Sequence, residues 1–233
     1  VWAINEKEYV DTMPSQDTAF SSLASTFRNK EFRKFVASDI LYWIAITMFQ
    51  TGLPFFVTSL LKLPETMTTI YFIGMTALSL VFYIPINKLT PKFGKKKLIL
   101  VAFLMFAFAY LYTGFLGRIS AISANVQGYM LMAVASLPMA VFGILPQAVV
   151  ADIAQSDAKL TRSNREGMFY AARTFAFKFG QSLSMLLFTA VTTIGSATGA
   201  GYRVAAFVAA VFCMLGGIVF LFYNERKINQ SIN

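Results

Sequence analysis

The sequence predicts an all-α integral membrane protein with six transmembrane helices. Three observations support this fold class: the composition, a series of long apolar runs, and an uneven distribution of Lys and Arg. Of the 233 residues, 57% are hydrophobic and only 13% are charged, and the mean hydropathy is +0.61. A soluble domain carries about 25% charged residues. The polar side chains of this sequence are too few to cover the surface of a globular protein in water. Lipid must therefore solvate much of the chain.

Six apolar runs are each long enough to cross a bilayer, whose hydrocarbon core of about 30 Å requires about 20 residues of helix. They cover approximately residues 32–61, 66–87, 98–116, 127–151, 166–194 and 204–223. Runs this continuous lack the alternation of β-barrel strands. Gly52 and Pro54 predict a kink or a local break in the first run. Residues 1–31 form a polar segment and residues 224–233 a short tail.

Basic residues alternate between the loops in a way that predicts the orientation of the chain. Fifteen fall in segments expected on one side: Lys7, Arg28, Lys30, Arg33, Lys34, Lys88, Lys92, Lys95, Lys96, Lys97, Lys159, Arg162, Arg165, Arg226 and Lys227. The opposite loops hold only Lys62, Arg118 and Arg203. The positive-inside rule therefore places both termini in the cytoplasm. Because the charges are spread over separate loops, they do not indicate nucleic-acid binding.

Several functional classes are disfavoured by what the sequence lacks. It contains no His and a single cysteine, Cys213, which lies in an apolar run. A disulfide framework, a zinc site and a haem site are therefore not expected. The sequence shows no nucleophile–base pair and no phosphate-binding loop, so we do not expect an enzyme.

Two cations, Arg173 and Lys178, lie inside the fifth apolar run. Charge within a membrane helix is costly and usually faces a bundle interior or a water-filled path. If the helix enters the membrane at Glu166, Lys178 lies about 18 Å deep. Tyr170, Thr174, Gln181 and Met185 share an arc of about 80° with it. This stripe predicts a substrate-binding face of Lys178, Thr174, Gln181 and Tyr170. A structural ion pair for Lys178 is the alternative.

Arg173 lies about 140° around the helix from Lys178 and shares a face with Glu166. We expect it to make a gating or structural contact near the cytoplasmic end, with Asp39 or Asp152 as the partner. Judged from its shallow position in the first run, however, Asp39 is expected to pair with a cation from a loop. Arg165 and Glu166, which open the fifth run, complete the predicted gating group.

The first run has a stripe of its own on one side, formed by Asp39, Trp43, Ile46, Gln50 and Pro54. The amide of Gln50 could bond a hydroxylated solute, and the indole of Trp43 offers a flat surface of the kind sugar rings pack on. Both are therefore candidates for substrate binding. Core packing is the competing interpretation for each of them.

The segment Leu145–Ser182 carries a family resemblance. Ala151-Asp152-Ile153 follows a proline-containing helix, and after a short charged loop Arg165-Glu166-Gly167 opens the next helix. Tyr170, Thr174, Lys178 and Gly180 follow. This pattern resembles helix eleven, and the loop before it, in the glycoside–pentoside–hexuronide:cation symporters. These are relatives of melibiose permease within the major facilitator superfamily. The segment Asn87–Lys97 resembles that superfamily's basic loop, with Pro91 at the acidic position.

The resemblance implies one half of a twelve-helix transporter, in which residues 1–31 correspond to the central cytoplasmic loop. The chain would then be a fragment or a half-transporter that needs an N-terminal six-helix half as its partner. The implied function is symport of a sugar, glycoside or similar small polar solute by alternating access, in a bacterial cytoplasmic membrane. Na⁺ or H⁺ would be the coupling ion, held mainly by the missing half, and no covalently bound cofactor is expected. A lysolipid or other amphipathic substrate, and a non-transporting scaffold or receptor, are the alternatives.

Overall fold

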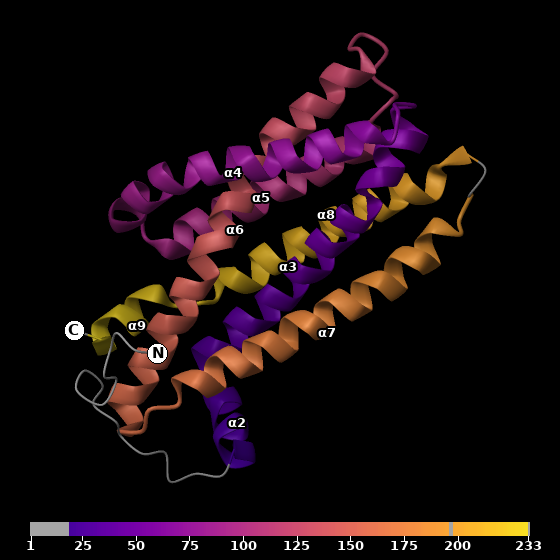
Figure 1. Ribbon diagram of the computed structural model, residues 1–233. Helices are drawn as coiled ribbons and strands as arrows, with labels where there is room; N and C mark the ends of the chain where they lie inside the picture. Colours follow the sequence, from indigo (N-terminus) through magenta and orange to yellow (C-terminus); the bar gives the residue numbers. More distant parts are fainter. Residues whose placement is uncertain (1–18, 196–197, 233) are drawn as a thin grey trace, which may run out of the picture.

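The protein is described here by a computed structural model, which covers residues 19–195 and 198–232. Every regular element in these two ranges is helical, in line with the expected all-α fold (Figure 1). The elements are α2 (Ala19–Arg28), α3 (Lys30–Phe55), the π-helical turn η1 (Phe56–Leu60), α4 (Thr66–Phe93), α5 (Lys95–Phe115), α6 (Ala124–Thr161), α7 (Glu166–Thr192), α8 (Ala200–Leu221) and α9 (Glu225–Ile232).

The long helices form an elongated bundle in which α3, α8 and α5 pack in sequence. α7 lies along the outer side of α3, and α4 packs on α6, which in turn contacts α5 (Figure 1). The short helices α2 and α9 lie at one end of the bundle. Aromatic rings join the helices at the centre: Tyr42 of α3 stacks on Phe142 of α6 at 3.9 Å between centroids, and Phe103 of α5 meets Phe142 edge-on. These contacts fix α3, α5 and α6 relative to one another.

Within residues 19–195 and 198–232, five helices are long and apolar enough to cross a membrane: α3 together with η1, α4, α5, α6 and α8. The sequence predicts six. The exception is α7, which has 27 residues and packs along α3. Its shortfall is therefore one of composition rather than of length, because Lys178, Gln181 and several Ser and Thr residues lower its hydropathy.

Several helices extend beyond the expected membrane segments. α4 continues to Phe93 and α5 begins at Lys95, so only Gly94, with a φ of 82°, separates them. The expected basic loop is thus almost entirely helical. α6 likewise continues to Thr161, ten residues past the expected boundary at 151. Hydropathy marks where the apolar surface ends, whereas the helical backbone continues into water wherever the residues permit it.

The local break expected in the first apolar run is confirmed. The α-helical pattern of α3 ends at Phe55, directly after Pro54, and the π-helical turn η1 follows. Proline lacks the amide proton that the i→i−4 pattern requires, so a change of helical geometry beside it is expected. Gly52 makes room for this turn, because a Cβ there would lie 2.4 Å from the ring of Phe56.

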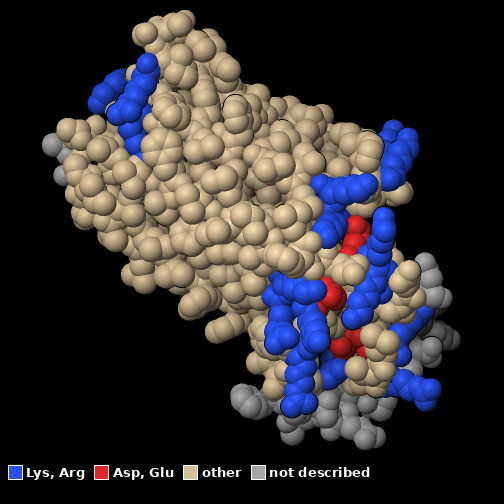
Figure 2. Space-filling model, turned by 180° about the vertical axis from the view of Figure 1, so that it is seen from behind, with Lys and Arg blue, Asp and Glu red and all other residues tan. Residues whose placement is uncertain are grey.

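Charged side chains gather at the two ends of the bundle. Figure 2 shows most Lys and Arg at one end, interspersed with acidic side chains, and a small basic group at the other. On this face the surface between the two groups is free of charged side chains. The end richer in basic residues carries α2, α9 and the connections α4–α5 and α6–α7, and we call it the basic end.

Candidate functional site

A buried ion pair joins α3 to α7. The guanidinium of Arg173 donates through Nε to Oδ2 of Asp39 at 3.0 Å and through a terminal nitrogen to Oδ1 at 3.3 Å. Both side chains are buried, and the guanidinium also lies 5.7 Å from the ring centroid of Phe35. Asp39 therefore pairs with a cation inside a helix, so the expectation of a loop cation is wrong. Of the two acids proposed for Arg173, the structure selects Asp39.

Two further contacts hold α7 close to α3. A Cβ on Gly180 would lie 3.1 Å from the carbonyl oxygen of Ile40 and 3.3 Å from Cβ of Trp43, so glycine permits a near approach of the helices. One turn further, the buried hydroxyl of Ser184 donates to the carbonyl of Ile44 at 2.8 Å. Together with the ion pair, these contacts form the α3–α7 seam.

Lys178 lies outside this seam. Its side chain is exposed, and the ring of Phe177 lies 5.0 Å from its ammonium nitrogen. Thr174 and Met185 of the same stripe are also exposed, while Tyr170 and Gln181 are half-buried. The structure therefore directs the predicted polar stripe of α7 away from α3 and out of the bundle. Within the described ranges no carboxylate lies within ion-pair distance of Lys178.

The predicted stripe on α3 does not form one continuous face. Asp39 and Ile46 are buried, Trp43 is half-buried, and Gln50 is exposed. The rings of Trp43 and Phe177 lie 4.9 Å apart, and the same Phe177 ring lies 5.0 Å from the ammonium nitrogen of Lys178. α7 covers α3 around Asp39 and Trp43, and α3 emerges at Gln50. Thus Trp43 is partly accessible and Gln50 is exposed, whereas Ile46 belongs to the core.

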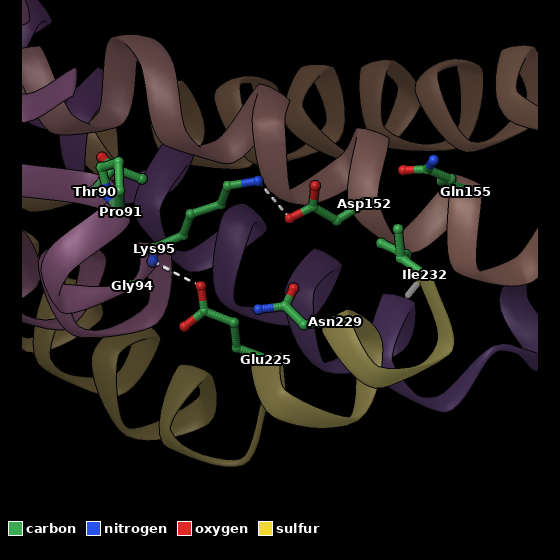
Figure 3. Close-up of a pocket in the computed structure, with 9 residues that line it drawn as sticks. All are labelled: Thr90, Pro91, Gly94, Lys95, Asp152, Gln155, Glu225, Asn229 and Ile232. Carbon is green, nitrogen blue, oxygen red and sulfur yellow. Dashed lines mark hydrogen bonds and ion pairs between the residues drawn. The ribbon is translucent and has the colours of Figure 1, made fainter. Parts of the chain in front are cut away.

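Asp152, another predicted gating residue, lies in a pocket at the basic end (Figure 3). Its Oδ2 accepts a hydrogen bond from the ammonium of Lys95, the first residue of α5. Glu225 of α9 accepts from the backbone amides of Lys95 at 2.7 Å and Lys96 at 3.1 Å. A carboxylate at a helix N-terminus satisfies free amides and opposes the positive end of the helix dipole. The pocket has a volume of about 420 Å³, and Gln155 and Asn229 also line it.

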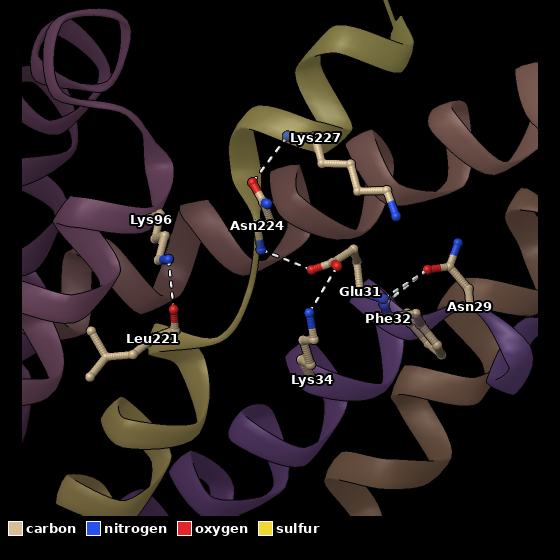
Figure 4. A network of polar contacts seen from close by, with 8 residues as sticks. All are labelled: Asn29, Glu31, Phe32, Lys34, Lys96, Leu221, Asn224 and Lys227. Atoms are coloured by element: carbon tan, nitrogen blue, oxygen red, sulfur yellow. Dashed lines mark hydrogen bonds and ion pairs between the residues drawn. The ribbon is translucent and has the colours of Figure 1, made fainter.

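A second group of contacts connects the ends of α3 and α8 (Figure 4). Glu31 accepts from the ammonium of Lys34 at 2.9 Å and from the backbone amide of Asn224 at 2.8 Å. Lys96 donates to the carbonyl of Leu221, the last residue of α8, at 2.7 Å. These bonds tie the α8–α9 connection to the first turns of α3 and α5.

The two remaining gating candidates lie at the start of α7. Arg165 donates to Oδ2 of Asp157 at 2.8 Å, and the amide of Asn29 donates to Oδ1 of the same carboxylate at 3.2 Å. Glu166 is exposed and lines a hollow between α6 and α7 with Gln155 and Asn164. It does not share the surroundings of Arg173, which is buried against α3.

Sequence reasoning did not single out four residues on which these arrangements depend: Lys95, Asp157, Ser184 and Glu225. Lys95 stood among similar cations in a basic run, and Glu225 lay in an expected tail. The partners of Lys95 and Glu225 are 57 or more residues away, so no local spacing links these residues to them. Ser184, which lies between Gln181 and Met185 of the polar stripe, was the easiest of the four to find from the sequence. In the described part of the chain, no group of three His, Cys, Asp or Glu side chains is arranged as a metal site.

Comparison with known proteins identifies the family. The family model described as MFS/sugar transport protein matches residues 2–224, nearly the whole chain. Searches of curated proteins and of solved structures gave no significant match. The family match agrees with the all-helical bundle, its apolar helices and the cations on α7. This chain therefore belongs to the MFS/sugar transport protein family, whose members are major facilitator transporters, and it is an integral membrane protein.

Proposed function

We propose that the chain is the C-terminal six-helix half of a cation-coupled symporter for a sugar, glycoside or similar small polar solute. The observation that carries this proposal is the exposed, unpaired ammonium of Lys178 in the middle of α7, among the polar side chains of its stripe. A charge at that depth needs water, a counter-charge or a polar solute. Asp39 is already engaged by Arg173. We therefore expect the partner of Lys178 to come from outside this bundle.

The location of the stripe fits the alternating-access mechanism. Transporters of this kind bind solute near the midplane, between two bundles that rock against each other. Lys178, Thr174 and Gln181 of α7, with Gln50 of α3, would contribute donors and acceptors from this side. The similarity to the melibiose permease group supports a glycoside-like substrate and Na⁺ or H⁺ coupling. We propose that the N-terminal half supplies the rest of the solute site and most of the ion site.

The first test of this function is solute uptake into proteoliposomes that contain the complete transporter, in which this bundle is present together with its N-terminal half. A panel of sugars and glycosides is tested under an inward Na⁺ gradient, under an inward proton gradient and with no gradient. Symport predicts accumulation of at least one solute under only one of the gradients. Uptake that merely equilibrates in all three conditions would exclude coupling. A panel without any uptake would favour a scaffold or receptor.

The second test replaces Lys178 by Met, which keeps the length of the side chain and removes the charge. Loss of one charge-assisted hydrogen bond to the solute should lower kcat/KM about tenfold or more. Lys62→Met, which removes an exposed cation at the far end of the bundle, is the matched control and should transport normally. Equal uptake by the two variants would remove Lys178 from the transport path.

A further inference from the structure

An apolar groove lies on the outer surface between α5 and α8. It has a volume of about 280 Å³, and its lining is almost entirely hydrocarbon. Phe103 forms its floor, and Leu104, Met214, Ile218 and Leu221 form its exposed walls. Gly217 keeps the floor open, because a Cβ there would lie 3.2 Å from Cβ of Phe103. In a membrane protein, a groove of this kind on two apolar helices faces lipid.

A cationic pocket of about 470 Å³ lies at the basic end of the same groove. Four cations line it: Lys92, Lys96, Lys97 and Arg226. Leu100 lines both the pocket and the groove, and Lys96 donates to the carbonyl of Leu221, which also lines the groove. The two cavities therefore adjoin each other, with the cations at the basic end.

The charges of this pocket are largely uncompensated. Its one carboxylate, Glu225, accepts backbone amides of α5 with both oxygens. Lys92, Lys97 and Arg226 are exposed, and no carboxylate of the described ranges lies within ion-pair distance of them. The pocket thus presents several cations at the basic end of the apolar groove.

We propose that the pocket and the groove together bind an anionic phospholipid. The phosphate lies among Lys92, Lys96, Lys97 and Arg226, and one acyl chain lies in the groove over Phe103. From Lys97 to Leu104 the helix rises about 10 Å. The groove therefore covers the half of the acyl chain that is nearer the headgroup. Basic pockets beside transmembrane helices recognise anionic headgroups through such clusters of cations. The groove adds a requirement for an acyl chain, which a free phosphate does not meet. This lipid site lies between α5 and α8, whereas Lys178 lies on α7, and it does not depend on the identity of the solute.

Native mass spectrometry of the purified protein tests the proposal. Phosphatidylglycerol and phosphatidylcholine with identical acyl chains are compared as ligands. The structure predicts at least tenfold preference for phosphatidylglycerol. The triple variant Lys92→Gln, Lys97→Gln, Arg226→Gln should weaken phosphatidylglycerol binding on the order of tenfold to a hundredfold. Lys96 is kept because it caps α8.

A matched triple variant controls for net charge. Lys30→Gln, Arg33→Gln and Arg162→Gln remove three exposed cations from the same end, outside the pocket. This variant should bind phosphatidylglycerol within about twofold of the unmodified protein, since its pocket is intact. Equal weakening by the two triple variants would overturn the site and leave only general attraction to the basic end.

The position of the acyl chain is tested separately. Ile218→Trp fills the groove and should weaken binding of both lipids, whereas Val211→Trp, on the same exposed side of α8 and outside the groove, should not. Glycerol phosphate, which has no acyl chain, should fail to displace bound phosphatidylglycerol. Displacement by glycerol phosphate, or the same effect from both Trp variants, would refute the groove as a lipid-chain site.

Discussion

Arg173 and Lys178 lie five residues apart on α7 and meet opposite surroundings. Five residues rotate a helix by about 140°, so one cation faces α3 while the other faces outward. Arg173 is buried against Asp39 with two hydrogen bonds. Lys178 is exposed beside the ring of Phe177. The first cation is therefore engaged inside the bundle, whereas the second has its charge on the outer surface of the bundle.

The ion pair of Arg173 and Asp39 should show strong coupling between its members. Removal of one partner leaves a buried charge without compensation, at a cost of about 3–5 kcal/mol. Asp39→Asn or Arg173→Gln alone should lower Tm by about 6 °C or more, as measured by thermal unfolding in detergent. The double variant should be less destabilised than the sum of the two.

The pair of Lys34 and Glu31 provides the control for this cycle. The Lys34 side chain is 35% exposed, and Glu31 keeps its hydrogen bond from the backbone amide of Asn224, so Lys34→Gln should change stability by less than about 1 kcal/mol. Additive effects of Asp39→Asn and Arg173→Gln would mean that the two side chains do not interact in the folded protein.

At the level of elements, the α3–α7 seam places the polar stripe. The ion pair at Arg173, the close approach at Gly180 and the hydrogen bond of Ser184 all lie on one side of α7. They fix the rotation of α7 about its axis, and this rotation turns Lys178 outward. The direction of the stripe is therefore a consequence of the seam.

The glycine at position 180 should be intolerant of side chains. Gly180→Val would force α7 away from the backbone of α3 and should cost about 1–3 kcal/mol, with a lower Tm and reduced uptake. Gly167→Val, on the same helix, is the control, since a Cβ there meets nothing within 4 Å. If the two variants have the same Tm, the near approach at Gly180 has no energetic importance.

The sequence sufficed for the helices but not for their contacts. Apolar runs located every long helix, and Pro54 located the change of helical geometry, because both depend on neighbouring residues. The extension of α6 to Thr161 and the single-residue turn at Gly94 were missed, since hydropathy does not report helix ends in water. The sequence left Asp39 with two possible partners, a loop cation and Arg173, for a related reason. Its pairing depends on the packing of α7 against α3, 134 residues away.

At the level of the whole molecule, the separation of charge predicts one orientation in the membrane. The basic end should lie in the cytoplasm, because clusters of Lys and Arg are retained there during insertion. A recognition sequence for a specific protease, inserted after Ser120 or after Ser163, can report this. Added outside intact spheroplasts, the protease should cleave only at the 120 site, and in inside-out vesicles only at the 163 site. The reverse pattern would refute the orientation.

The central claim is that the polar stripe of α7 faces a water-filled solute path, and thiol accessibility tests it most directly. Thr174→Cys and Gln181→Cys are compared with Leu186→Cys, which is exposed on the apolar side of the same helix, each in protein lacking other cysteines. A charged, membrane-impermeant thiol reagent should modify positions 174 and 181 in the membrane-embedded protein, and the transported solute should slow that reaction. Position 186 should stay unmodified. Modification confined to position 186, or no protection by any transported solute, would contradict the claim.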